Sequence, residues 1–128
     1  MPLKYHIDSE ARLLFIVGEG AITQEERMET MRAWLRDPAY RPGLDTLCDF
    51  SATTSTPKLM ELKEIVAVIK RNADLIGRKK LAMVVDNPAT HAVARQFRAF
   101  VDPSALDVNV FKDRGTAMAW LRGDAVVR

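Results

Sequence analysis

The chain has 128 residues and a mass of 14.4 kDa, and 48% of its residues are hydrophobic and 28% charged, which predicts a single globular domain with a full apolar core. The net charge of +2 is too balanced to indicate a nucleic-acid partner or an anionic membrane surface. One cysteine cannot form an internal disulfide, and no apolar run approaches the about 20 residues that span a bilayer, so we expect a cytoplasmic protein with no membrane span.

Two strands open the chain. Apolar and polar residues alternate over 3–7, which predicts a half-buried edge strand. Residues 13–17 are all apolar and predict a second strand, covered on both faces and paired with the first as a hairpin. Gly18 and Gly20 follow, and we expect the strand to end there.

Helices and strands alternate in the middle of the chain. Thr23 and Glu26 have the spacing of a capping box, which predicts a helix after Thr23. A strand is predicted over 44–50. Thr56 as N-cap and Pro57 as first helical residue predict a long helix that continues to residue 76. Its expected buried stripe comprises Leu59, Leu62, Val66, Ile69 and Ala73.

The last third of the chain repeats the alternation. Residues 81–85 predict a buried strand, and Asn87 followed by a proline predicts the start of a helix. A last strand is predicted over 108–111, followed by a short helix capped by Asp113.

The predicted order is therefore β-β-α-β-α-β-α-β-α. This order indicates an α/β domain over residues 1–122, with a mainly parallel mixed sheet and an antiparallel N-terminal edge strand. Residues 123–128 are expected to fray. Ligands of such sheets bind beyond the carboxyl ends of the strands, so we expect a site to be built from residues 18–23, 49–56, 86–90 and 111–115.

A hydroxyl-rich loop is the segment most suggestive of chemistry. It follows a strand and precedes a predicted helix start, where unpaired N–H groups favour anions. It is a candidate ligand or switch loop, through anion capture or phosphorylation of a hydroxyl, but helix capping and local turns are the simpler explanation. Its residues are Asp49, Ser51, Thr53, Thr54, Ser55 and Thr56.

A strand-end crevice is the second candidate site. Asp49, Asp86 and Asp113 are predicted at neighbouring strand ends, where clustered carboxylates could bind Mg²⁺ or provide a general acid. Asp86 and Asp113 are also natural helix caps, and His91 has no second histidine or cysteine at metal-ligand spacing. We expect no metal and no cofactor. The candidate crevice residues are Gly20, Asp86, Asn87, His91 and Asp113.

Three further features have structural explanations. Cys48 is expected to be a buried small hydrophobe. Met60 falls off the main stripe of its helix and could face a dimer partner or an apolar ligand, although a wider buried face of the helix explains it as well. The basic residues around the end of the long helix are expected to form a solvated, dipole-matched surface; they are Lys70, Arg71, Arg78, Lys79 and Lys80.

Several short segments carry a family resemblance. They are Tyr5-His6-Ile7, residues 14–20, Cys48-Asp49-Phe50-Ser51, residues 81–86, and Val110-Phe111 with residues 117–121. Together they resemble the SpoIIAA-like fold of STAS domains, in particular its bacterial STAS/SEC14-like branch. In anti-sigma factor antagonists of this fold, phosphorylation of a serine in an Asp-Ser-x-Gly signature controls partner binding. At the position of this signature the present chain has Thr54-Ser55-Thr56-Pro57, which lacks the preceding Asp and the following Gly. A second match is Asp49-x-Ser51, which corresponds to an Asp-x-Ser at the strand end of the family that is mainly structural.

The sequence thus supports a non-enzymatic STAS-like regulatory or interaction module, with a protein partner or a homodimer. The alternative is a carrier or sensor of a small apolar or anionic ligand, because the SEC14 part of the resemblance implies a lipid-type ligand. A third alternative is an enzyme using Asp49, Asp86 and His91, which requires these side chains to converge in one cleft.

Overall fold

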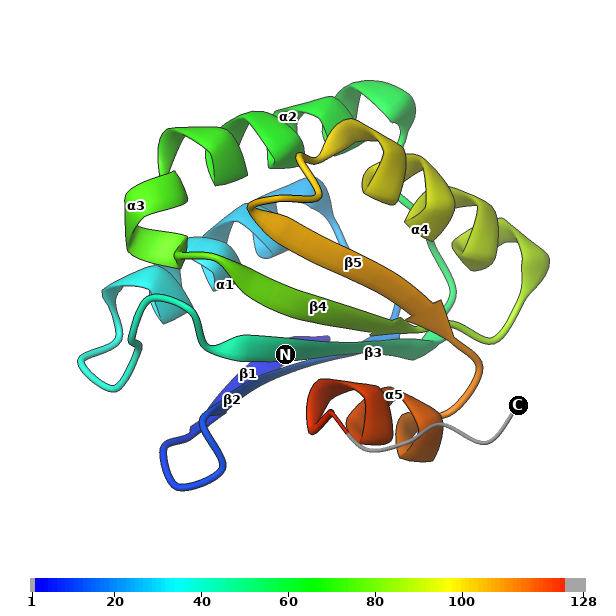
Figure 1. The fold of residues 1–128 in the computed structure, drawn as a ribbon. Coiled ribbons are helices and arrows are strands. Elements are labelled where there is room, and N and C mark those ends of the chain that lie inside the picture. Colours follow the sequence, from blue (N-terminus) through cyan, green and yellow to red (C-terminus); the bar gives the residue numbers. More distant parts are fainter. Residues whose placement is uncertain (1, 124–128) are drawn as a thin grey trace.

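A five-stranded sheet forms the centre of the molecule, and helices cover both of its faces (Figure 1). The computed structural model describes residues 2–123. The elements in chain order are β1 (Leu3–Asp8), β2 (Leu13–Gly20), α1 (Gln24–Arg36), β3 (Asp45–Thr53), α2 (Leu59–Arg71), α3 (Ala73–Ile76), β4 (Lys79–Val84), α4 (Pro88–Phe100), β5 (Leu106–Phe111) and α5 (Arg114–Leu121).

The strands lie side by side in the order β1-β2-β3-β4-β5. The first pair is antiparallel, and β2, β3, β4 and β5 are parallel to one another. The predicted mixed sheet with an antiparallel N-terminal edge strand is confirmed. Each parallel connection carries at least one helix, as a crossover between parallel strands requires.

Helices α1, α2 and α4 cover one face of the sheet, and α5 packs on the other (Figure 1). On the three-helix face, Leu14, Cys48 and Met83 lie in clusters with Leu62, Trp34 and Phe97. On the α5 face, Leu47 and Val84 pack against Ala117 and Leu121. Alternate residues of one strand therefore belong to two different cores, which confirms that the strand around residues 13–17 is covered on both faces.

Side-chain caps fix the starts of three helices as predicted. The Thr23 hydroxyl accepts a hydrogen bond from the N–H of Glu26, and the Glu26 carboxylate accepts one from the N–H of Thr23, which completes a capping box. Asn87 accepts from the N–H of Thr90 at the start of α4, and Asp113 accepts from the N–H of Thr116 at the start of α5.

Several predicted boundaries were wrong. β2 continues through Gly18 to Gly20 because the neighbouring strand β3 is longer than predicted and supplies hydrogen-bond partners to its end. The predicted long helix is divided at Asn72 into α2 and α3. Ala73, in the short helix after this division, is exposed. Leu59, at the other end of α2, is 48% exposed rather than buried.

No helix among residues 2–123 is both long and apolar enough to cross a membrane. The predicted tail over 123–128 lies, apart from Gly123, outside the described residues.

Candidate functional site

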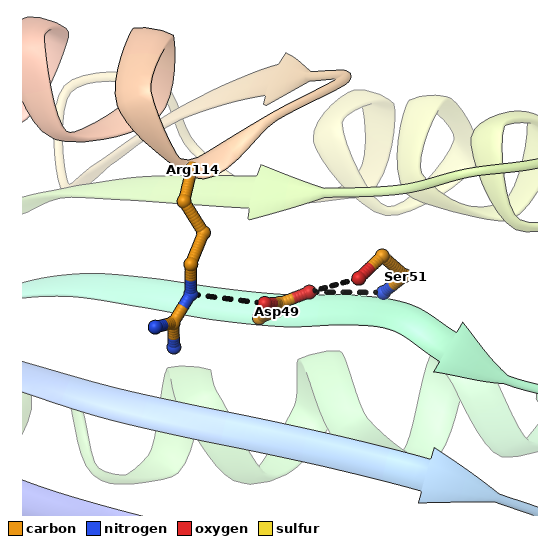
Figure 2. A network of polar contacts seen from close by, with 3 residues as sticks. All are labelled: Asp49, Ser51 and Arg114. Carbon is orange, nitrogen blue, oxygen red and sulfur yellow. Dashed lines mark hydrogen bonds and ion pairs between the residues drawn. The ribbon is translucent and has the colours of Figure 1, made fainter.

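The Asp49–Ser51 segment is a bulge inside β3, not the end of the strand. Val17 pairs with Asp49 and Glu19 with Ala52, so β3 has one more residue than β2 between these two pairs. The Asp49 Oδ1 atom accepts hydrogen bonds from the Ser51 N–H at 3.0 Å and from the Ser51 hydroxyl at 2.6 Å (Figure 2). The side chain of Asp49 thereby accepts a hydrogen bond from a backbone N–H that has lost its regular strand partner at the bulge.

The other oxygen of Asp49 faces the α5 side of the sheet. Its Oδ2 atom lies 2.9 Å from Nε of Arg114, the first residue of α5 (Figure 2). The guanidinium is largely exposed, so this ion pair is weak. Asp49 and Ser51 therefore hold the bulge together, and Asp49 also contacts the start of α5.

Gly18 explains how β2 passes this bulge. A Cβ atom at Gly18 would lie 2.7 Å from Cδ1 of Ile22 and 2.8 Å from Cγ2 of Thr53, closer than carbon atoms normally approach. The glycine therefore lets β2 pack closely against the bulged end of β3.

Ser55 is the half-buried residue of the hydroxyl-rich loop whose side chain bonds to another segment of the chain. Its Oγ atom accepts a hydrogen bond from the N–H of Ile22 at 2.9 Å, and the hydroxyl lies 3.3 Å from the carbonyl of the same residue. The Thr54 N–H donates to the carbonyl of Gly20. These bonds join the end of β3 to the segment between β2 and α1. The segments 18–23 and 49–56, two of the four from which a site was expected, therefore lie in contact.

The predicted N-cap role of Thr56 was wrong. α2 begins at Leu59, and its N-cap is Lys58, whose N–H donates to the Glu61 carboxylate at 2.8 Å. Thr56 is exposed, and its hydroxyl makes no hydrogen bond to a described residue. The chain favours the later start because Glu61 is three residues after Lys58 and supplies the reciprocal bond that Thr56 cannot receive.

A pair of alanine variants tests these assignments. Ser55→Ala is expected to lower the free energy of unfolding by about 1–2 kcal/mol, because the buried N–H of Ile22 loses its acceptor. Thr56→Ala is expected to change it by less than about 0.5 kcal/mol, because the hydroxyl has no partner to lose. Urea unfolding of both variants measures the difference. A loss of about 1 kcal/mol in Thr56→Ala would restore the capping role.

The candidate crevice residues do not form one constellation. Asp113 and Asn87 are the caps of α5 and α4, and Asp86 and His91 are exposed. Backbone hydrogen bonds from the Thr116 N–H hold the pKa of Asp113 below its usual range. Within residues 2–123, no hydrogen bond or ion pair joins Asp49 to Asp86 or His91, and no three His, Cys, Asp or Glu side chains are grouped as metal ligands.

A cavity of about 180 Å³ lies between the sheet and the three-helix face. Its floor comes from β2, β3, β4 and β5, and its roof from α1, α2 and α4. One end is lined by Thr53, Ser55, Thr56 and Thr90, so part of the hydroxyl-rich loop forms its rim. The walls are mainly apolar and include Ile16, Met31, Leu62, Ile65, Met83, Val93, Ala94, Phe97 and Leu106.

The opposite end of this cavity contains a buried lysine. Lys79 is 6% exposed and begins β4, beside the start of β3. Its Nζ atom donates a hydrogen bond to the Thr46 hydroxyl at 2.8 Å and contacts the Tyr40 hydroxyl at 3.4 Å. The ammonium also lies 4.7 Å from the centre of the Trp34 ring. Burial lowers the pKa of Lys79 to about 8.

Lys79 corrects the expectation of a solvated basic surface at the end of the long helix. The side chain turns inward because strand alternation places Lys79 on the face of Leu81 and Met83, whereas Lys80 lies on the face of Ala82. Lys80 reaches the α5 side and lies over the ring of Trp120. The alternation of residues 79–84 between the two faces of a strand could have predicted that Lys79 points inward. This was missed because the basic residues were interpreted as one surface.

Cys48 lies on the cavity floor and is buried, as predicted. Burial raises the pKa of its thiol to about 12, so the thiol is protonated and unreactive at neutral pH.

The comparisons with known proteins concern the fold. The sequence matches no family model and no curated protein. The structure is similar to that of an uncharacterized protein of the DUF3478 family from Shewanella loihica PV-4, described as having a SpoIIAA-like fold. The TM-score is 0.62 with 14% sequence identity, over 93% of this chain and 91% of that chain. With the mixed sheet, its strand order and its helices, this likeness shows that the chain has a SpoIIAA-like fold.

Proposed function

We propose that this protein, a STAS-like module, binds a small and mostly apolar ligand in the cavity between the sheet and helices α1, α2 and α4, as a carrier or sensor. The cavity itself carries this proposal. An engineered apolar cavity of about 150 Å³ is large enough to hold benzene, and the cavity here is about 180 Å³ with mainly apolar walls. Close packing is the rule in protein interiors, where voids larger than a water molecule are few.

The rim of the cavity supports an entry path at the loop. Thr56 is exposed and Ser55 and Pro57 are half-buried, yet all three line the cavity. The hydroxyl-rich loop is thus part of the proposed site through its position at the rim. This function needs no reactive group, consistent with the protonated thiol of Cys48.

An alanine-to-leucine pair on α4 tests the proposal. Ala94 lines the cavity and is 1% exposed, whereas Ala92 is exposed on the same helix. Leucine at position 94 adds three carbon atoms to the cavity. Ala94→Leu is expected to weaken binding of octanol, a neutral probe, by about tenfold or more, and to keep or raise the stability. Ala92→Leu is expected to leave binding unchanged. Calorimetric titration and thermal unfolding measure both quantities.

The controls separate the cavity from the rest of the surface. Equal octanol affinity in wild type and Ala94→Leu would place the probe elsewhere and overturn the proposal, and so would equal weakening in Ala92→Leu. Native mass spectrometry of the purified wild-type protein provides an independent readout: a mass excess that disappears on denaturation identifies a ligand retained from the cell.

The second candidate function is an interaction module with a protein partner or a second copy of the chain. Two exposed apolar side chains favour it: Met60 is 75% exposed and Leu59 48% exposed, both on the first turn of α2. They follow the loop at the cavity rim directly in sequence. If octanol does not bind and the native mass shows no bound ligand, the interaction module replaces the ligand carrier as the proposed function.

A further inference from the structure

Among residues 2–123, the ammonium of Lys79 has no counter-ion at the inner end of the cavity. It forms no ion pair with a carboxylate of residues 2–123, and Asp45, which raises the pKa of Lys79 from nearby, accepts a hydrogen bond from the backbone of Lys80 instead. A buried charge is costly unless it is paired and hydrogen-bonded. With a pKa of about 8, Lys79 nevertheless remains mostly charged at neutral pH.

The hydroxyls of Thr46 and Tyr40 accept hydrogen bonds from Lys79 and donate their own protons to backbone carbonyls. The Thr46 hydroxyl donates to the carbonyl of Leu44 at 3.1 Å, and the Tyr40 hydroxyl donates to the carbonyl of Ile76 at 2.8 Å. Both oxygens therefore present lone pairs to the ammonium. An ammonium has three N–H donors, and only these two oxygens among the described residues accept from Nζ, so its third N–H has no oxygen acceptor there.

Arg27 is the other cation that lines the cavity, and its surroundings differ. The guanidinium donates to the carbonyl of Ile22 at 3.0 Å and to the Gln24 side chain at 3.2 Å. Carboxylates of Glu26 and Glu61 are close enough to favour its charged form. Arg27 is half-buried and already surrounded by acceptors, so Lys79 is the cation at which an anion from outside the chain would complete the site.

We propose that the ligand of this cavity is a small carboxylic acid whose carboxylate binds the Lys79 ammonium, with its apolar part along the cavity toward the hydroxyl-rich loop. This inference rests on the proposed function. The cavity extends from Thr46, near the start of β3, to Ser55, beyond its end, which fits a linear apolar chain. The free N–H donor, the aromatic wall of Trp34 and the apolar floor match the head and the chain of such an acid.

The test compares octanoate with octanol and octanamide, which have the same chain length without the negative charge. On the wild-type protein, octanoate is expected to bind about tenfold more tightly than the two neutral probes, because it makes a charge-assisted hydrogen bond. In Lys79→Met this preference is expected to disappear while octanol binding remains. Lys80→Met is the matched control, since it removes the same charge from the next residue, on the opposite face.

The titration tests the proposed function, the carboxylate and the role of Lys79 separately. Binding of neither acid nor alcohol would overturn the proposed function itself. Equal binding of octanoate and octanol to the wild type would overturn the carboxylate inference alone, and this comparison requires no variant. A preference for octanoate that persists in Lys79→Met would assign the carboxylate to another cation and overturn the role of Lys79.

Tryptophan fluorescence locates the carboxylate independently. The chain has two tryptophans, and Trp120 lies on the α5 face, so Trp120→Phe leaves Trp34 as the reporter beside Lys79. Octanoate is expected to change the emission of this variant, because it alters the contact between the ammonium and the indole. Binding by calorimetry without any change in emission would place the acid away from Lys79 and contradict the inference.

Discussion

Replacing Gly77 by alanine is expected to lower the free energy of unfolding by about 3 kcal/mol or more. Gly77 has φ +75°, which L-residues rarely adopt, and a Cβ atom there would lie 2.4 Å from the backbone N of Gly43 and 2.8 Å from the carbonyl carbon of Pro42. Both contacts are to backbone, so no side-chain rotation relieves them. The turn before β4 would have to move away from the loop before β3.

Gly20→Ala is the matched control for this variant. Gly20 has a similar φ of +66°, but an added Cβ would meet no atom within 4 Å. This control measures the cost of a positive φ without a close contact, which we expect to be about 1–2 kcal/mol. Urea unfolding of the two variants measures the difference. Equal losses would show that the close approach of Gly77 to residues 42–43 contributes nothing.

The stability of the protein is expected to rise by about 1 kcal/mol between pH 8 and pH 9. Burial lowers the pKa of Lys79 from 10.5 to about 8. Above pH 8 the folded protein has released this proton while the unfolded chain still binds it. The unfolded state then binds more protons, so the free energy of unfolding increases with pH.

Cys48 has the opposite effect above pH 9. Burial raises the pKa of the thiol from 9.0 to about 12, so the unfolded chain releases the proton first and stability falls with pH. Between about pH 9 and pH 10 the rise in stability due to Lys79 and the fall due to Cys48 cancel. Above about pH 10 the raised pKa of the buried Tyr40 lowers the stability further. Stability should therefore reach a plateau between about pH 9 and pH 10.

Two variants separate these contributions. In Cys48→Ala the rise should continue to about pH 10 and reach about 2–3 kcal/mol, because the opposing thiol is gone. In Lys79→Met the rise should be absent, and stability should fall from about pH 9. Urea unfolding across this pH range gives each curve. A rise above pH 8 that persists in Lys79→Met would show that another group causes it.

Local signals of the sequence predicted most of the fold. Thr23 with Glu26, Asn87 and Asp113 predicted three helix starts, because an N-cap depends on residues within one turn. Runs of apolar residues predicted the strands, and the alternation of strands with helices predicted the parallel sheet. The start of α2 was missed because Thr56 has a capping side chain, whereas Lys58 begins the helix through the reciprocal bond to Glu61.

The cavity and Lys79 depend on distances that no local pattern contains. The inner end of the cavity combines Trp34, Thr46 and Lys79 from α1, β3 and β4. A cavity exists where side chains of distant elements fail to fill the space between them, so hydrophobic periodicity predicts the walls but not the space. The bulge at Asp49 likewise arises from the pairing of β3 with β2 and not from β3 alone.

Because the strand order in the sheet is the same as the order in the chain, each strand joins the edge left by the strand synthesised just before it. The hairpin of β1 and β2 can form first on the ribosome, and β3, β4 and β5 can extend it one at a time. Each strand pairing in the sheet then joins two strands that are consecutive along the chain, which favours rapid folding. Elongation of the polypeptide and growth of the sheet proceed in the same direction, and no strand has to be inserted between two that are already paired.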